Sequence, residues 1–468
     1  MRNRESGRRT SPLSCARAPG QFLSLPLPSP PGPTIFPPGA CDRLEAHLGA
    51  HLVGQGLAVR QLTDAVCDHA ARLEGKEGLG GSALPPKPLV LSAHGPPGVG
   101  KTLAAALTAS ALFAPPGRDP ADPAWACPGR ACPAHRVFFG LDFGGGAAGE
   151  AQLAAARRAL ASHAAAFPAG LIVVEEYDKL DCRARGLFRT MLAGSGGGGG
   201  SGGSVGGRAP GWTGGGANNA SSSSPPSLPP MPDLSRSIVL LESNTGYAHL
   251  AAALAAATEG AAAAAESGRD PAAAAVLAAD GDGRALLAPE TAARLLKDAV
   301  YETWAADGCE SPADTVRALA AVDWFLPFLP LHLSHVKTLL ARRLADRAAR
   351  AEAEAGLRLV WDDGVIDFLA ARVDVGEPLG LGGQAASPAG ALYPIEGGRE
   401  VGPLVTRYVT RAVREAGARL GGGASVAAGQ PLPVRRGTLV VADDGRGLEV
   451  RVEGGGGPAH STPCASSS

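Results

Sequence analysis

One stretch of the chain combines the residue types and the spacing that phosphate binding requires. It follows the pattern G-x-x-x-x-G-K-[ST] and consists of Gly95, Pro96, Pro97, Gly98, Val99, Gly100, Lys101 and Thr102. Glycines let backbone N–H groups curl around phosphate oxygens, the lysine reaches the β- and γ-phosphates, and the threonine hydroxyl binds Mg²⁺. The pattern therefore predicts a nucleoside triphosphate site with ATP and Mg²⁺ as its ligands. The alternative, a glycine-rich turn that precedes Lys-Thr by chance, is disfavoured by the apolar run before it and the helix predicted after it.

Two adjacent carboxylates end a second apolar run. Residues 171–174 read Leu-Ile-Val-Val, as expected of a central strand in a parallel sheet, and Glu175 and Glu176 follow directly. In such a pair the first carboxylate organises Mg²⁺ and its waters, and the second polarises the attacking water. We therefore expect Glu175 to be a metal ligand and Glu176 to be catalytic, although the first position is usually Asp. A solvated acidic loop is the alternative.

Two further side chains are expected to sense the γ-phosphate. Asn244 follows the apolar run of residues 237–241, where its amide would orient water near the phosphate. Arg399 follows two glycines and precedes a helix predicted over residues 401–416, so it would reach the nucleotide from a separate domain. Asn is also common in turns and Arg on surfaces, so both assignments depend on the phosphate loop and the acid pair.

These side chains require a fold that brings distant strand ends together. Apolar runs at residues 89–91, 136–142, 171–174 and 237–241 predict strands that alternate with helices. This order is typical of a doubly wound α/β fold with a parallel sheet, where catalytic groups gather at the carboxyl ends of neighbouring strands. The phosphate loop predicts a P-loop fold. The helical region around Arg399 indicates the AAA+ type, with a C-terminal helical lid subdomain.

Composition divides the chain into parts. A Pro/Ser-rich N-terminus is expected to be a disordered leader or targeting segment, and a Gly/Ser/Pro tract a disordered insertion. The expected ranges are 1–40 for the leader, 41–332 for the AAA+ large α/β domain, 194–233 for the insertion within it, 333–421 for the small helical lid domain and 422–468 for a tail. Alternating residues on both sides of a turn predict a β-hairpin in the tail, over 438–441 and 448–452.

Charge and cysteine content limit the classes of function. The 468 residues carry 43 basic and 44 acidic side chains, so no basic surface for nucleic acid is expected. No run of about 20 apolar residues predicts a membrane span. The eight cysteines are scattered and define no disulfide framework, which leaves the redox compartment undecided. Cys127, Cys132 and His135 would supply only three of the four ligands of a zinc site.

Several longer stretches resemble one family. Leu52-Val-Gly-Gln55 looks like the adenine-side box of Clp-type AAA+ proteins. The stretches similar to torsins, a Clp-related branch, are Lys87-Pro-Leu-Val-Leu-Ser-Ala-His-Gly95, Glu175-Glu-Tyr-Asp-Lys179, Leu241-Glu-Ser-Asn-Thr-Gly246 and Val322-Asp-Trp-Phe-Leu-Pro-Phe-Leu-Pro-Leu331. The resemblance covers about residues 41–417 without the insertion, and its Phe-Leu-Pro-Phe-Leu-Pro element is the most specific part.

The resemblance implies an ATPase of the endoplasmic reticulum lumen and nuclear envelope that works on protein substrates as a homo-oligomer. Ala321 stands where Clp proteins carry an arginine finger, a group worth about 10³–10⁵ in rate, so hydrolysis by the chain alone would be very slow. In torsins a membrane-anchored activator protein supplies this arginine, and the resemblance implies the same kind of partner here. Torsins usually have Asn after the loop lysine, Asp at the start of the acid pair and Gly-Cys-Lys in the small domain, whereas this chain has Thr102, Glu175 and Gly397-Gly398-Arg399.

Two other hypotheses stay open. A Clp-type unfoldase of a plastid, mitochondrion or the cytoplasm would need an arginine finger elsewhere and an aromatic pore loop, for which Phe143-Gly144 is the candidate. A non-catalytic ATP-binding scaffold would tolerate Glu175 and Ala321, and would assemble on nucleotide without turnover. The arginine-rich N-terminus with its short, proline-broken apolar run resembles a poor signal peptide or a transit peptide, which leaves the compartment open.

Overall fold

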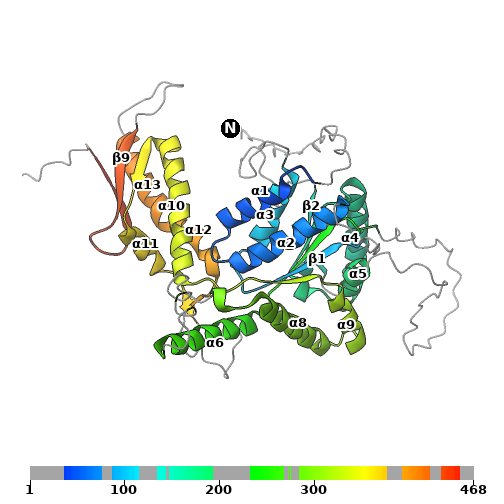
Figure 1. The fold of residues 1–468 in the computed structure, drawn as a ribbon. Helices are drawn as coiled ribbons and strands as arrows, with labels where there is room; N and C mark the ends of the chain where they lie inside the picture. Colours follow the sequence, from blue (N-terminus) through cyan, green and yellow to red (C-terminus); the bar gives the residue numbers. More distant parts are fainter. Residues whose placement is uncertain are drawn as a thin grey trace, which may run out of the picture.

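The computed structural model describes residues 36–75, 87–114, 134–143, 147–192, 232–267, 272, 275, 284–376, 393–421 and 434–453 (Figure 1). Most of the predicted leader and of the predicted insertion lies outside these residues, as do Cys127, Cys132 and Gly144. In the part of the chain that is described, no helix has the length and apolar character needed to cross a membrane.

Five parallel strands form the central sheet, in the order β2-β3-β4-β1-β5. Their bounds are Leu89–His94 for β1, His135–Phe139 for β2, Leu171–Glu175 for β3, Ile238–Ser243 for β4 and Trp324–Pro327 for β5. β4 lies between β1, which leads into the phosphate loop, and β3, which leads into the acid pair. The carboxyl ends of these three strands therefore meet at one edge, and the predicted α/β class with a parallel sheet is confirmed.

Two strands differ from the sequence-based prediction. The apolar runs do not predict β5, because prolines interrupt its segment. It pairs with β1 at the edge of the sheet, where a proline such as Pro327 removes no hydrogen bond from a central ladder. The strand predicted over 136–142 was placed too far along the chain, because β2 ends at Phe139 and a 3₁₀ turn, Gly140–Phe143, follows.

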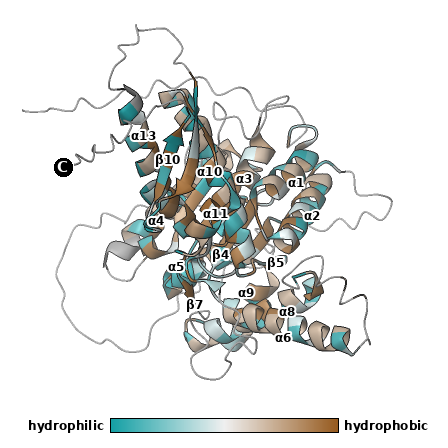
Figure 2. Cartoon of the chain, turned by 90° about the vertical axis from the view of Figure 1, so that its left-hand side faces the viewer, coloured by the Kyte–Doolittle hydropathy of each residue, from teal (hydrophilic) through white to brown (hydrophobic). Residues whose placement is uncertain are grey.

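The sheet is buried on both faces. Val173 and Leu240 pack into one apolar cluster, whereas the residues that follow them, Val174 and Leu241, pack into a second cluster on the opposite face. Burial on both faces explains why these strands are continuous apolar runs without polar alternation. The first cluster is covered by α1 (Ala40–His51), α2 (Gly56–Leu73) and α3 (Lys101–Phe113), and the second by α4 (Ala147–Ala166), α5 (Cys182–Leu192), α6 (Tyr247–Glu266), α8 (Pro289–Ala306) and α9 (Pro312–Ala320). In Figure 2, α1 and α2 each carry hydrophilic and hydrophobic residues, as expected of helices with one buried face.

A smaller unit follows the sheet and lies beside it, on the left of Figure 1. It contains α10 (Leu333–Ala355), β6 (Leu357–Val360), α11 (Asp363–Ala370), α12 (Val401–Leu404), α13 (Arg411–Gly421), β9 (Arg435–Val441) and β10 (Leu448–Val452). The predicted hairpin is confirmed, because β9 and β10 are antiparallel neighbours. β9 also pairs in parallel with β6, so the hairpin completes a three-stranded sheet with the segment after α10. The N-cap of α11 is Asp362, whose carboxylate accepts from the Val365 amide.

Four cysteines form two disulfides, so the expectation that the cysteines define no disulfide framework was wrong for these four. Cys41–Cys67 joins α1 to α2, and Cys182–Cys309 joins the start of α5 to the turn between α8 and α9. The bonded residues are 26 and 127 positions apart, and their Cα atoms lie 5.7 and 5.0 Å apart. Sequence spacing could not reveal these pairs, because helix packing brings their members together.

Removing the longer disulfide is expected to destabilise the protein. The change of Cys182 and Cys309 to serine frees a loop of 127 residues in the unfolded chain, which should lower the free energy of unfolding by about 2–4 kcal/mol. Thermal and denaturant unfolding of the full chain measure this effect. A reductant should destabilise the wild-type protein more than a variant that lacks both pairs. Equal stability of wild type and the double serine variant would contradict the prediction.

Candidate functional site

The phosphate loop turns sharply between β1 and α3. Gly98 and Gly100 have φ values of 76° and 105°, in the left-handed region that side chains disfavour. Gly98 also touches a distant segment, since its carbonyl accepts from the Gly398 amide at 2.9 Å and a Cβ on it would lie 1.8 Å from the Glu396 carbonyl oxygen. The phosphate loop therefore packs directly against the turn that contains Arg399.

Replacing Gly98 by alanine should separate the phosphate loop from this turn. The methyl group cannot fit against the Glu396 carbonyl, so either the loop or residues 396–399 must move. We expect ATP affinity to fall at least about tenfold, as isothermal titration would measure, because backbone groups that cradle phosphate lose their placement. Gly75→Ala is the matched control, because Gly75 has a similar φ of 69° with nothing within 4 Å of the added carbon. Similar ATP affinities for the two variants would show that the contact has no role in binding.

The Lys101 side chain is hydrogen-bonded to Asn244 and to the phosphate loop itself. The lysine Nζ donates to the Gly95 carbonyl at 2.6 Å, to the Pro96 carbonyl at 2.9 Å and to Asn244 Oδ1 at 2.9 Å. Burial lowers the pKa of Lys101 to about 8, while the nearby Glu242 carboxylate acts in the opposite direction. The ammonium therefore remains mostly charged at pH 7, held by three neutral acceptors that a phosphate group can replace.

Glu176 has an unusual backbone conformation. Its φ of 52° makes it the one non-glycine residue with a positive φ in the described part of the chain. Such a conformation costs about 1–3 kcal/mol and persists only where the surroundings impose it. Gly140 belongs to those surroundings, because a Cβ there would lie 2.2 Å from the Glu176 carbonyl oxygen. The turn after β2 thus holds the residue expected to activate water in a fixed, strained position.

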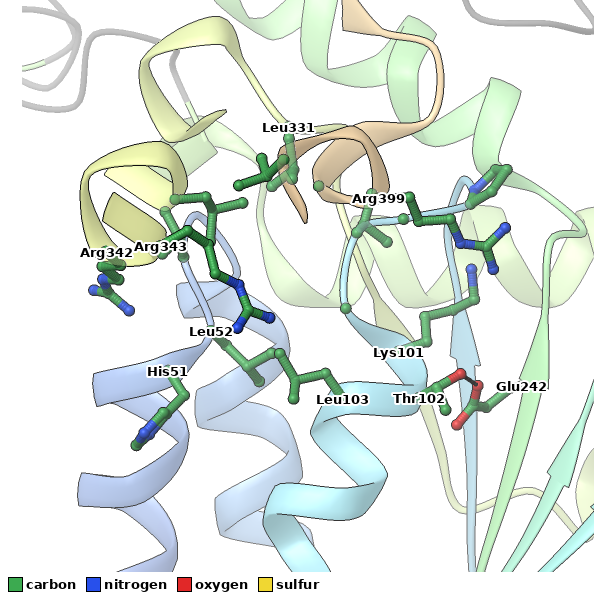
Figure 3. A pocket seen from close by; sticks show the side chains of 18 of the residues that line it. His51, Leu52, Lys101, Thr102, Leu103, Glu242, Leu331, Arg342, Arg343 and Arg399 are labelled. Carbon is green, nitrogen blue, oxygen red and sulfur yellow. Dashed lines mark hydrogen bonds between the residues drawn. The ribbon is translucent and has the colours of Figure 1, made fainter. Parts of the chain in front are cut away.

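A third carboxylate, that of Glu242, accepts a hydrogen bond from the phosphate loop. The site predicted from the sequence did not include this residue. Thr102 Oγ1 donates to Glu242 Oε2 at 2.7 Å, and the Glu242 side chain is only 3% exposed (Figure 3). Burial raises its pKa to about 7, the Thr102 hydrogen bond acts against this rise, and the Glu175 carboxylate adds to it. The signal was present in the sequence, because Glu242 ends an apolar run just as Glu175 does.

The candidate side chains line one cavity of about 710 Å³. Its lining includes the predicted residues Glu175, Glu176, Asn244 and Arg399, together with Glu242 and the loop from Pro97 to Thr102. Gly95 and Pro96 are not part of the lining, but their carbonyls hold Lys101. Figure 3 shows Arg399 and Lys101 directed toward the same space.

Apolar side chains also line the cavity and can pack against a nucleobase. They include Leu52, Val53, Leu331 and Leu339, and His51, Arg342 and Arg343 lie on the same side (Figure 3). Gln55, the last residue of the predicted adenine-side box, does not line the cavity. Its amide instead donates to the Leu329 carbonyl at 2.8 Å and accepts from the Leu329 amide at 2.9 Å, which joins this box to the Phe-Leu-Pro element.

Two arginines on α10 line the cavity and were not predicted. Arg342 donates to the Ala50 carbonyl at 2.5 Å, and Arg343 lies 3.6 Å from Asp346 on the same helix. The apolar residues of this helix, such as Leu340, form its buried face, but they do not show which polar residues reach the cavity. Only the position of α10 beside the phosphate loop assigns Arg342 and Arg343 to the site.

Other candidates lie away from this cavity or outside the described residues. Phe143 is buried, with its ring centroid 5.9 Å from that of Phe188 in an edge-to-face contact. It is a core residue and not an exposed pore-loop aromatic. Across the described ranges, no group of three or more His, Cys, Asp and Glu side chains is placed to hold a metal ion. Ala321 is half-buried against the second apolar cluster.

Comparison with known proteins adds no relative: no family model matches the chain, and no curated protein matches its sequence. The functional assignment therefore depends on the residues of the site and on their geometry.

Proposed function

We propose that this protein is a torsin-like AAA+ ATPase, which binds ATP with Mg²⁺, hydrolyses it slowly and uses the cycle to remodel protein partners. One observation carries the proposal. Side chains from four distant parts of the chain, Lys101, Glu176, Asn244 and Arg399, line one cavity that also has apolar side chains to hold a base. This is the set of groups that phosphoryl transfer to water requires.

Each side chain has a role in this proposal. The loop amides and Lys101 hold the β- and γ-phosphates, and Arg399 approaches the γ-phosphate from the small unit. Glu176 polarises the attacking water, and Asn244 orients it. The oxygen donors Thr102 and Glu175 fit Mg²⁺, which takes few protein ligands and completes its shell with phosphates and water. When bound, Mg²⁺ neutralises charge on the transferred phosphoryl group.

Slow hydrolysis follows from a missing arginine. Ala321 occupies the position of the arginine finger in the Clp proteins that the chain resembles, and its half-buried methyl group carries no charge. Because a finger is worth about 10³–10⁵ in rate, a partner that donates an arginine would act as an activator. We assign this role to a membrane-anchored activator protein that docks on a homo-oligomer of the chain.

The two disulfides favour an oxidising compartment. Disulfides persist in secretory compartments and are rare in the cytosol. They therefore support the endoplasmic reticulum lumen or nuclear envelope over the plastid, mitochondrial or cytoplasmic alternative. The burial of Phe143 further disfavours a threading unfoldase, because a pore loop must present its aromatic side chain to the substrate.

ATP binding and turnover by the purified full chain test the proposal. Titration calorimetry should detect ATP binding, and phosphate release should be far below about 1 s⁻¹, the low end of typical kinase rates. Brisk turnover would support a Clp-type enzyme with an arginine finger elsewhere. Binding with no phosphate release under any condition would support the scaffold hypothesis, and a protein that does not bind ATP would refute the proposal.

A further inference from the structure

Glu242 occupies a position where a carboxylate reaches the phosphate loop from a neighbouring strand. On β4 it is paired in register with Ala93 of β1, and it lies one residue beyond the Val174↔Leu241 pair that links β3 to β4. Glu242 and Glu175 are therefore level with each other on adjacent strands. Side chains alternate along a strand, so Glu242 points to the same face as Leu240. That face packs against α3, whose first turn contains Thr102.

The Glu242 carboxylate has one oxygen without a hydrogen-bond partner. Its Oε2 accepts from Thr102, but its Oε1 is buried and has no hydrogen-bond partner among the described residues. A buried polar atom without a partner costs about 1–3 kcal/mol, and more when it is charged. Glu242 lines the cavity, so its carboxylate lies beside the space where a phosphate-bound cation would be held.

The hydrogen bond also determines what the Thr102 hydroxyl can do. A hydroxyl has one hydrogen to donate and two lone pairs that can bind a metal or a donor. Because Glu242 takes the hydrogen, the lone pairs of Thr102 Oγ1 remain available for a cation. A carboxylate that fixes the orientation of a metal ligand in this way typically contributes 10- to 100-fold to metal affinity.

We propose that Glu242, together with Thr102, holds the Mg²⁺ of the bound nucleotide in this protein. The inference rests on the proposed ATP site and adds Glu242 to the residues that hold its metal ion. The acid that supports the loop threonine comes from β4, the strand between the phosphate loop and the acid pair, and Glu175 on β3 is an additional carboxylate. Hydroxyl and carboxylate oxygens are hard donors that suit Mg²⁺.

Metal binding to the nucleotide complex tests this role without any measurement of turnover. Electron paramagnetic resonance can follow Mn²⁺, as a substitute for Mg²⁺, in the complex of the full chain with ADP. For Glu242→Gln we expect Mn²⁺ affinity to fall about 10- to 100-fold. ADP affinity in EDTA should match that of the wild type, because glutamine keeps the shape of the side chain. Glu242→Asp keeps the charge and is expected to lose less Mn²⁺ affinity.

Glu310→Gln is the matched control. Glu310 is also a buried glutamate with one oxygen in an ion pair, to Arg189, and one without a partner among the described residues, but it does not line the cavity. This variant should bind Mn²⁺ as the wild type does. Wild-type Mn²⁺ affinity in both Glu242 variants would overturn the proposal and leave ATP binding intact. A wild-type protein that binds no ADP, with or without metal, would overturn the ATP site and this inference together.

Discussion

Replacing Glu176 by glutamine should nearly abolish ATP hydrolysis while ATP stays bound. The amide cannot polarise the attacking water as a carboxylate does, and loss of such a group typically lowers the rate by about 10²–10⁴. Glutamine keeps the Cβ and the chain length, so the left-handed backbone at this position carries the same strain in both proteins. The change therefore isolates the chemistry of the carboxylate from the geometry of the turn.

Single-turnover phosphate release and retention of labelled ATP measure the two parts of this prediction. Because the wild type is expected to be slow, the comparison is made over hours and, where an arginine-donating activator is found, in its presence. Glu396→Gln is the control, since Glu396 is an exposed glutamate near the phosphate loop that does not line the cavity. Phosphate release at the wild-type rate in the Glu176 variant would remove this residue from the catalytic role.

Replacing Lys101 by alanine should remove most of the ATP affinity. A hydrogen bond to a charged group is worth about 1.5–3 kcal/mol, which corresponds to a loss of roughly 10- to 150-fold. The same change removes the hydrogen bonds that Lys101 donates to the Gly95 and Pro96 carbonyls and to Asn244 Oδ1, so the loop is also less well fixed. Both effects lower the affinity for the triphosphate.

Calorimetric titration with ATP and with adenosine distinguishes a phosphate contact from a general loss of structure. Adenosine should bind beside the apolar side chains of the cavity equally in wild type and variant, because it carries no phosphate for Lys101. Lys337→Ala provides the control, since Lys337 is a partly exposed lysine of α10 that pairs with Asp367 at 2.7 Å and does not line the cavity. Equal ATP affinity in the Lys101 variant and the wild type would contradict the assignment of the phosphate loop.

Local sequence patterns were sufficient for the parts of this protein whose partners lie nearby in the chain. The phosphate loop is one contiguous segment, so its strand, turn and helix could be predicted from the order of its residues. β3 and β4 could be predicted because burial on both faces requires unbroken apolar runs. The cap of α11 depends on Asp362 and an amide three residues later, which is also a local relation.

Strand order and helix packing decided the rest. The bond between Thr102 and Glu242 spans 140 residues and exists because β4 enters the sheet between β1 and β3. The Cys182–Cys309 disulfide and the approach of α10 to the loop likewise depend on how separate elements pack, and no spacing in the chain encodes them. β5 became visible only as a partner of β1, since a proline-containing strand is stabilised by its place at the sheet edge and not by its own propensity.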